Sequence, residues 1–228
     1  MIYVNGDSWT SGWPLEGTFG HRNHSWPHLL SELSSIEVFN DARTASSNYR
    51  IYRRTFDYIL NNSPKIAIIC LTSWARFELG DIKSGRIHQY LPHQKEVSFF
   101  YKKYWNPYLE YSNLLRRILS LQCVAQIKST KLYFLDTFND NLNMNPSYEW
   151  FTDILKMGDI FSKMDDEYIA KKYKKIIDLD KHINYNMFIS DKSYQSLVND
   201  CELVEGHPVE DGHIKIAKLI YEVIKKDI

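Results

Sequence analysis

The sequence predicts one α/β domain, a three-layer α/β/α sandwich around a mainly parallel sheet. Short apolar runs alternate along the chain with longer segments of helical periodicity. Glycine and proline are scarce, at 9 and 7 among 228 residues, and no repeat or linker divides the chain. A hydrophobic share of 44% and a charged share of 25% are typical of a globular protein. We therefore expect a single domain over residues 1–228.

The N-terminal part supplies three predicted strands and two predicted helices. Ile2–Asn5 is a short apolar run that ends at a glycine, and Ile36–Phe39 and Lys65–Leu71 are further runs of strand type. Between the first two strands, Ser25 is a good N-cap for a helix that continues to residue 33. Between the second and third, Ser47–Leu60 carries an apolar stripe at helical spacing.

The C-terminal part continues the alternation. Tyr108–Ile127 is predicted to be a long helix, Lys131–Leu135 a strand and His213–Lys226 a closing helix. Parallel strands need crossover helices, and ligands bind beyond the carboxyl ends of such strands. The stretch Phe138–Asn199 includes a helical piece at Tyr168–Ile177, and we expect this stretch to form an inserted cap over that end of the sheet.

Charge and apolar patterning exclude several classes of partner. Lys plus Arg and Asp plus Glu both number 28, which argues against binding to nucleic acid or to an anionic membrane. No apolar run is long enough to span a bilayer, and the N-terminus lacks a secretion signal, so we expect a cytoplasmic protein. Cys70, Cys123 and Cys201 are widely spaced and odd in number, which favours reduced thiols.

Two short segments carry residues suited to nucleophilic catalysis. Ser8 follows the first strand within Gly6-Asp7-Ser8-Trp9, where a serine hydroxyl would be exposed at the edge of the sheet. His207 lies in a loop before the last helix, two residues after Glu205. Taken singly, the first segment is better explained as a plain turn with a helix cap, and the second as a solvated loop histidine.

Together these segments resemble the SGNH or GDSL hydrolase superfamily, and most closely its small GDSW-type branch of bacteria and phages. Four segments in the family's order carry the resemblance: GDSWTSGWPLEG at Gly6–Gly17, NDARTASSNYRIYRRT at Asn40–Thr55, IICLTSWARFE at Ile68–Glu78 and GHPVEDGHIKIAKLI at Gly206–Ile220. The resemblance implies a flavodoxin-like fold with a mainly parallel, five-stranded sheet. It also implies serine-dependent hydrolysis of a carboxylic ester, without a metal or an organic cofactor.

The resemblance assigns a triad. Ser8 is its nucleophile and His207 its general base. The family usually has an aspartate three residues before the histidine, where this chain has Val204. Glu205 is the nearest carboxylate and is the expected acid, with Asp200 as the fallback.

The resemblance also assigns an oxyanion hole, a set of donors that stabilise the negative oxygen of the transition state. Its donors are the N–H of Ser8, the N–H of Ala45 at a position where glycine is usual, and a third group. The third segment lacks the family's asparagine. We expect the Thr72 hydroxyl to replace it, with the Asn48 amide as second choice.

Other polar and aromatic residues near these segments are candidate substrate contacts. Trp9, Trp74 and Arg76 are the ones we select, and an ion pair is an equal alternative for Arg76. Three arginines, Arg50, Arg53 and Arg54, form a solvated or salt-bridged helix face, or else one of them holds a carboxylate or phosphate of the substrate. The run of His21, His24 and His28 lacks the further ligands of a zinc site, so no metal is expected.

The expected reaction is removal of a small acyl group, such as acetyl, from a glycan or another polar molecule. The partner is then a small-molecule or glycan ester, and the oligomeric state stays open. One alternative is an O-acyltransferase, in which a sugar hydroxyl replaces water. Another is a glycan-binding or interaction module whose catalytic site has decayed.

Overall fold

Four parallel strands form the central sheet of the computed structural model, which describes residues 1–13, 15, 24–80, 87–91, 94–138 and 166–228. β1 (Ile2–Asn5) pairs with β2 (Val38–Asn40) on one side and with β3 (Ile66–Leu71) on the other. β6 (Lys131–Asp136) extends the sheet beyond β3. The order β2-β1-β3-β6 follows the flavodoxin-like pattern, as predicted.

The expected fifth strand is present only as a single bridge among the described residues. Phe188 makes a parallel bridge to Phe134 of β6, and the Ile189 N–H donates to the Phe134 carbonyl over 2.8 Å. The 3₁₀ helix Tyr185–Met187 comes directly before it, so the chain is extended for too short a length to build a ladder.

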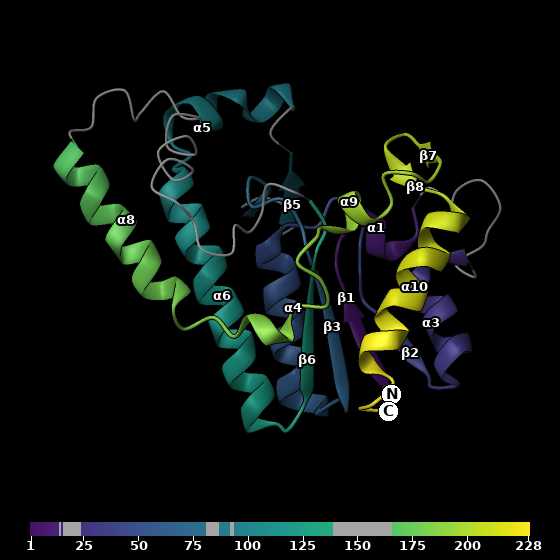
Figure 1. Ribbon diagram of the computed structural model, residues 1–228. Helices are drawn as coiled ribbons and strands as arrows, with labels where there is room; N and C mark the ends of the chain where they lie inside the picture. The colour runs from purple at the N-terminus through teal and green to yellow at the C-terminus, as the bar shows by residue number, and fades with distance from the viewer. Residues whose placement is uncertain (14, 16–23, 81–86, 92–93, 139–165) are drawn as a thin grey trace.

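The two faces of the sheet are covered by different helices, which gives the predicted three layers (Figure 1). Alternate residues of a strand point to opposite faces. Tyr3, Ala67 and Ile69 join one buried core, whereas Val4 and Ile68 join the other. The helices on the two faces are α4 (Asn48–Asn62) with α6 (Pro107–Ile127), and α3 (Trp26–Ser34) with α10 (Glu210–Ile224).

Side-chain caps fix where two of these helices begin. The Ser47 hydroxyl accepts the Arg50 N–H over 3.1 Å at the start of α4. The Asn106 side chain accepts the Leu109 N–H over 3.0 Å before α6. Each such cap satisfies one of the backbone donors that the first turn of a helix leaves unpaired.

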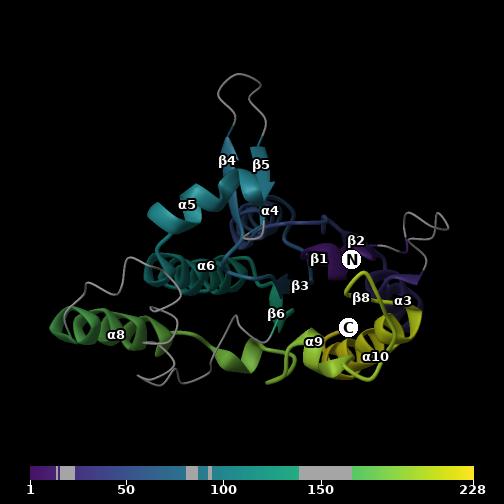
Figure 2. The ribbon, with the colours of Figure 1, turned by 90° about the horizontal axis from the view of Figure 1, so that it is seen from above.

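A hairpin and a short helix lie between β3 and α6, where the sequence predicted no element. β4 (Phe77–Gly80) and β5 (Ile87–Tyr90) pair antiparallel, and a 3₁₀ turn (Lys95–Val97) leads into α5 (Ser98–Lys103). The hairpin projects away from the sheet in Figure 2. Its base is held by stacking of the Phe77 and Phe100 rings, with centroids 4.3 Å apart.

The described part of the expected cap packs beside the helix layer. α8 (Asp166–Asp180) runs along α6 in both ribbon views and contributes the fully buried Ile176 to its core. After the bridge at Phe188, the short helix α9 (Tyr194–Leu197) leads to the C-terminal part. Residues 139–165 lie outside the described residues, so the cap itself stays a prediction.

The chain ends with a small hairpin and a long helix. β7 (Leu203–Val204) and β8 (His207–Pro208) pair antiparallel next to α1, the short helix Ser8–Ser11. No helix among the described residues has the length and apolar character needed to cross a membrane.

Candidate active site

The candidate site lies at the carboxyl ends of β1 and β3. The chain runs from β1 to β2 on one side and returns to β3 on the other, so the strand order reverses between β1 and β3. Asp7 and Ser8 follow β1, and Thr72 follows β3. Such a switch point is where open α/β sheets bind their ligands, because the loops after the two strands diverge there.

Asp7 sets the turn that presents Ser8. Its carboxylate accepts the Trp9 N–H over 3.1 Å, and its carbonyl accepts the N–H groups of Thr10 and Ser11. The backbone of Gly6, the residue before Asp7, lies very close to Thr10, since a Cβ on Gly6 would be 2.3 Å from the Thr10 hydroxyl oxygen. The Ser8 N–H is the first of α1 and makes no bond within the described chain, as expected at a helix start.

Ser8 and His207 meet although 199 positions separate them. The Ser8 Oγ lies 2.8 Å from the His207 Nε2. The other ring nitrogen, Nδ1, lies 2.9 Å from the backbone carbonyl oxygen of Glu205. A carbonyl only accepts, so Nδ1 carries the proton and donates it, and Nε2 is left to accept the Ser8 hydroxyl. This is the tautomer that a general base needs.

A tight hairpin turn aims the carbonyl of Glu205 at the ring. Val204 pairs with His207 across the turn, which leaves a loop of two residues, Glu205 and Gly206. Their φ angles are 50° and 75°, the left-handed values of a type I′ turn. Glu-Gly is a weaker signal for this turn than Asn-Gly, and the sequence analysis did not use it.

The expected acid of the triad, the Glu205 carboxylate, is therefore wrong, because a different group of the same residue contacts His207. The Glu205 side chain is exposed, and the backbone oxygen of Glu205 contacts His207 where the carboxylate was expected. Asp200, the fallback, pairs with Lys215 over 2.7 Å, which lowers the pKa of that carboxyl. The left-handed backbone at Glu205 explains the difference, because it turns the carbonyl inward.

Both side chains expected to complete the oxyanion hole are occupied. The Thr72 hydroxyl is fully buried and donates to the Asp7 carboxylate over 2.7 Å. The Asn48 amide pairs with the Thr72 backbone, accepting its N–H over 2.9 Å and donating to its carbonyl. Thr72 and Asn48 thus join α4 to the end of β3, and these bonds hold both side chains in place.

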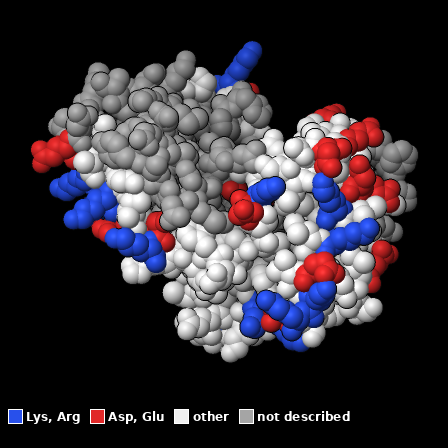
Figure 3. Space-filling model, in the orientation of Figure 1, with Lys and Arg blue, Asp and Glu red and all other residues white. Residues whose placement is uncertain are grey.

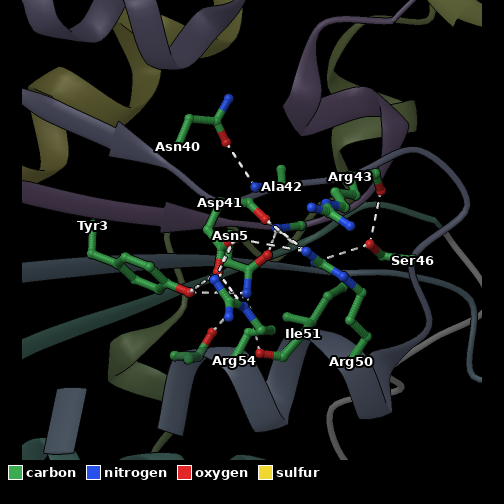
Figure 4. Close-up of polar contacts among 12 residues, drawn as sticks. Tyr3, Asn5, Asn40, Asp41, Ala42, Arg43, Ser46, Arg50, Ile51 and Arg54 are labelled. Atoms are coloured by element: carbon green, nitrogen blue, oxygen red, sulfur yellow. Dashed lines mark hydrogen bonds and ion pairs between the residues drawn. The ribbon is translucent and has the colours of Figure 1, made fainter. Parts of the chain in front are cut away.

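Figure 4 shows a polar network that holds the loop between β2 and α4, and Ala45 lies in this loop. Its φ of 62° is a left-handed value, which accounts for the glycine usual at this position. Arg50 donates to the Asp41 carbonyl and to the Ser46 hydroxyl, each over 3.3 Å, and so closes the loop. The Arg43 N–H donates to the Gly6 carbonyl over 3.3 Å, which ties this loop to the Ser8 turn.

The three arginines of α4 are used in ion pairs. Arg54 binds the Asp41 carboxylate through two nitrogens at 2.9 and 3.1 Å, and Arg50 lies 3.6 Å from the same group. Burial lowers the pKa of the Arg50 guanidinium, and Asp41 opposes that effect. Arg53 pairs with the buried Glu78 over 3.6 Å. This arrangement favours the ion-paired interpretation over a site for an anionic substrate.

Arg76 reaches back to the Ser8 turn. Its Nη1 lies 2.9 Å from the Asp7 carboxylate, which is fully buried and also accepts the Thr72 hydroxyl. The same nitrogen lies 3.4 Å from the Ser46 carbonyl. Asp7 is the residue that the sequence analysis missed as the centre of this network.

Trp9 and Trp74 were expected to contact substrate, and the structure corrects this. They are only 3% and 5% exposed. Trp9 packs edge-on against Tyr194 with the α3 and α10 core, and Trp74 stacks on Trp105 in the other core. Trp13 lies nearer the site, since its ring is edge-on to the His207 ring at 4.6 Å, compared with 6.0 Å for Trp9.

The histidine run is dispersed into separate pairs. His24 bonds to Glu210 over 2.7 Å and His28 to Glu32 over 3.3 Å, whereas His21 lies outside the described residues. The described residues contain no group of three side chains that could hold a metal ion. His24 and His28 each have a carboxylate partner instead.

Buried groups next to the site are held in neutral form. His213, on α10, accepts the Tyr194 hydroxyl over 2.9 Å, and its burial lowers the pKa to about 3. Burial raises the pKa of the Cys70 thiol to about 12, so this cysteine is no nucleophile. All three cysteines are free, in keeping with the expected reduced thiols.

Comparison with solved structures places this arrangement among known folds. TesA aligns over 100% of this chain and 99% of its own, with a TM-score of 0.53 and 12% identity. A catalytic mutant of Axe2, an acetylxylan esterase from Geobacillus stearothermophilus, covers 98% and 93%, with a TM-score of 0.52 and 13% identity. A protein assigned to the G-D-S-L lipolytic family of Desulfitobacterium hafniense DCB-2 covers 97% and 98%, with a TM-score of 0.50 and 19% identity.

The chain has the SGNH/GDSL hydrolase fold. No family model matches the sequence, and no curated protein does either, so the likeness is one of structure.

The surface charge is mixed on the face seen in Figure 3. Blue Lys and Arg side chains lie among red Asp and Glu side chains over this face, without a broad area of one sign. An extended phosphate backbone needs such a basic area.

Proposed function

We propose that this protein is a serine-dependent ester hydrolase in which Ser8 is the nucleophile and His207 the general base. The 2.8 Å contact between the Ser8 Oγ and the His207 Nε2 carries the proposal. Pairing of a hydroxyl with a correctly oriented imidazole activates a serine that is otherwise a poor nucleophile. The acetylxylan esterase among the structures of the same fold supports it.

In the proposed reaction, His207 removes the hydroxyl proton as the Ser8 oxygen attacks the ester carbonyl. The alcohol leaves with that proton, and water then releases the acyl group from Ser8 by the same route in reverse. The Glu205 carbonyl keeps the ring oriented throughout, although it lacks the charge of a carboxylate. The N–H groups of Ser8 and Ala45 are the proposed backbone donors to the oxyanion.

The proposed substrate is an ester of a small acyl group on a polar molecule. The Trp9 and Trp13 rings lie 6.0 and 4.6 Å from the His207 ring, centroid to centroid. Bulky rings that border the catalytic pair favour acetyl over a long acyl chain. The acetylxylan esterase among the structures of similar fold is consistent with this choice.

Hydrolysis of p-nitrophenyl acetate, butyrate and octanoate tests the proposal. We expect acetate to be the best substrate, and a fluorophosphonate probe to label Ser8 in a peptide map. Ser8→Ala is expected to lower kcat by at least about 10⁴-fold, because the step then lacks its nucleophile. Ser34→Ala, on α3 and far from His207, is the matched control and keeps parental activity. A parent that cleaves none of the esters and takes no label would refute the proposal.

A further inference from the structure

The Arg76 guanidinium lies between the two segments that carry the proposed backbone donors. Its Nη1 is 2.9 Å from the Asp7 carboxylate and 3.4 Å from the Ser46 carbonyl. Asp7 directly precedes Ser8, and Ser46 directly follows Ala45. One cationic group therefore contacts the neighbours of both N–H donors.

Most of the donors of this guanidinium are unused. Only Nη1 makes hydrogen bonds within the described chain, so Nε and Nη2 have none. The side chain is 13% exposed. Each of its nitrogens either has a hydrogen-bond partner or is accessible to solvent. The Phe138 ring lies 5.3 Å from the guanidinium carbon and limits its movement. The group is thus held in place with N–H donors left for a ligand.

The two side chains expected to complete the oxyanion hole already have other partners. The Thr72 hydroxyl is committed to Asp7 and the Asn48 amide to the Thr72 backbone. An oxyanion bound only by the N–H groups of Ser8 and Ala45 would lack a third donor. Loss of one donor typically costs about 10²–10³ in kcat.

We propose that Arg76 supplies this third donor, and so acts as a catalytic residue of the ester hydrolase proposed above, on which this inference rests. As the Ser8 oxygen bonds to the carbonyl carbon, the electron pair of the carbonyl double bond moves to its oxygen. An N–H of Arg76 donates a hydrogen bond to that oxygen and keeps its proton. Asp7 fixes the guanidinium beforehand, so little rearrangement accompanies the reaction. A charged donor binds an oxyanion about twice as strongly as a neutral one.

The test compares kcat for p-nitrophenyl acetate in three variants. Arg76→Met is expected to lower kcat by about 10²–10³-fold with little change in KM, since the contact forms only in the transition state. Arg76→Lys keeps the charge but not the forked set of N–H donors, so its kcat is expected to fall less than that of Arg76→Met. Arg53→Met removes another arginine that pairs with a buried carboxylate, Glu78, and serves as the matched control with parental kcat.

A double variant separates this role from simple neutralisation of Asp7. In Asp7→Asn with Arg76→Met no buried charge is left unpaired, so the double variant keeps its fold even if Arg76→Met alone does not. If Arg76 is an oxyanion donor, the double variant stays at least about 10²-fold slow. Recovery of kcat in the double variant, or an Arg76→Met enzyme within threefold of the parent, would overturn the inference alone. A parent without ester hydrolysis or a Ser8 label would instead overturn the proposed function, and this inference with it.

Discussion

The orientation of His207 by a backbone carbonyl predicts that the Glu205 side chain is dispensable. Glu205→Gln removes the carboxylate but leaves the carbonyl oxygen, which lies 2.9 Å from Nδ1, in its place. The side chain is exposed, so its charge acts through water. At roughly 5 Å in a water-like dielectric, two unit charges interact by about 1 kcal/mol. We therefore expect kcat to fall by less than about fivefold.

A second substitution at the same position changes the backbone instead of the charge. Proline holds φ near −65°, whereas Glu205 has a φ of 50°. Glu205→Pro should move the carbonyl away from Nδ1 and free the ring to adopt the wrong tautomer. Loss of the correct histidine tautomer in a serine triad lowers kcat about 10⁴-fold. Glu205→Asn, which tolerates the left-handed region, is the matched control and should behave like Glu205→Gln.

The assay is steady-state hydrolysis of p-nitrophenyl acetate, with the melting temperature measured for each variant. The expected order of kcat is parent, then Gln and Asn close together, then Pro far below. A Glu205→Gln variant that loses 100-fold or more at an unchanged melting temperature would refute the reasoning. It would mean that the carboxylate turns inward to His207 when substrate binds.

Two further predictions concern stability. Gly6→Ala places a Cβ 2.3 Å from the Thr10 hydroxyl oxygen and 2.9 Å from the Cys70 Cβ, so it should destabilise by about 1–3 kcal/mol and lower Tm by several degrees. Gly80→Ala, where a Cβ meets nothing within 4 Å, is the control, and equal Tm values would contradict the prediction. His213 has its pKa lowered to about 3, so its contribution to stability is complete above pH 6.5 and is lost as the pH falls toward 3. Between pH 7 and pH 5, protonation of His213 should lower the free energy of unfolding of the parent by about 2 kcal/mol, as measured by urea unfolding. The His213→Gln variant should lack this loss, and parallel pH profiles of the two proteins would contradict the prediction.

The sequence alone determined the layers of this protein, and the family resemblance supplied the flavodoxin-like strand order. The apolar runs at β1 and β3 are buried on both faces, which is typical of strands in the middle of a parallel sheet. The helices between them follow from apolar residues at helical spacing and from Ser47 at a cap position. These signals are local, and they were read correctly to within about three residues at each end. The position of Ser8 at the sheet edge follows from the same pattern.

Only the tertiary structure decided which atoms meet at the site. Hydrogen bonds join Ser8 to His207 and Asp7 to Arg76 across 199 and 69 positions, and no local pattern encodes such distances. The sequence pointed to a carboxylate at Glu205, yet the backbone angle there presents a carbonyl. Thr72 has the right residue type and the right place after its strand, but its hydroxyl is bound to Asp7. A residue's type tells which bonds it is able to make, whereas the fold determines which partner is close enough to receive them.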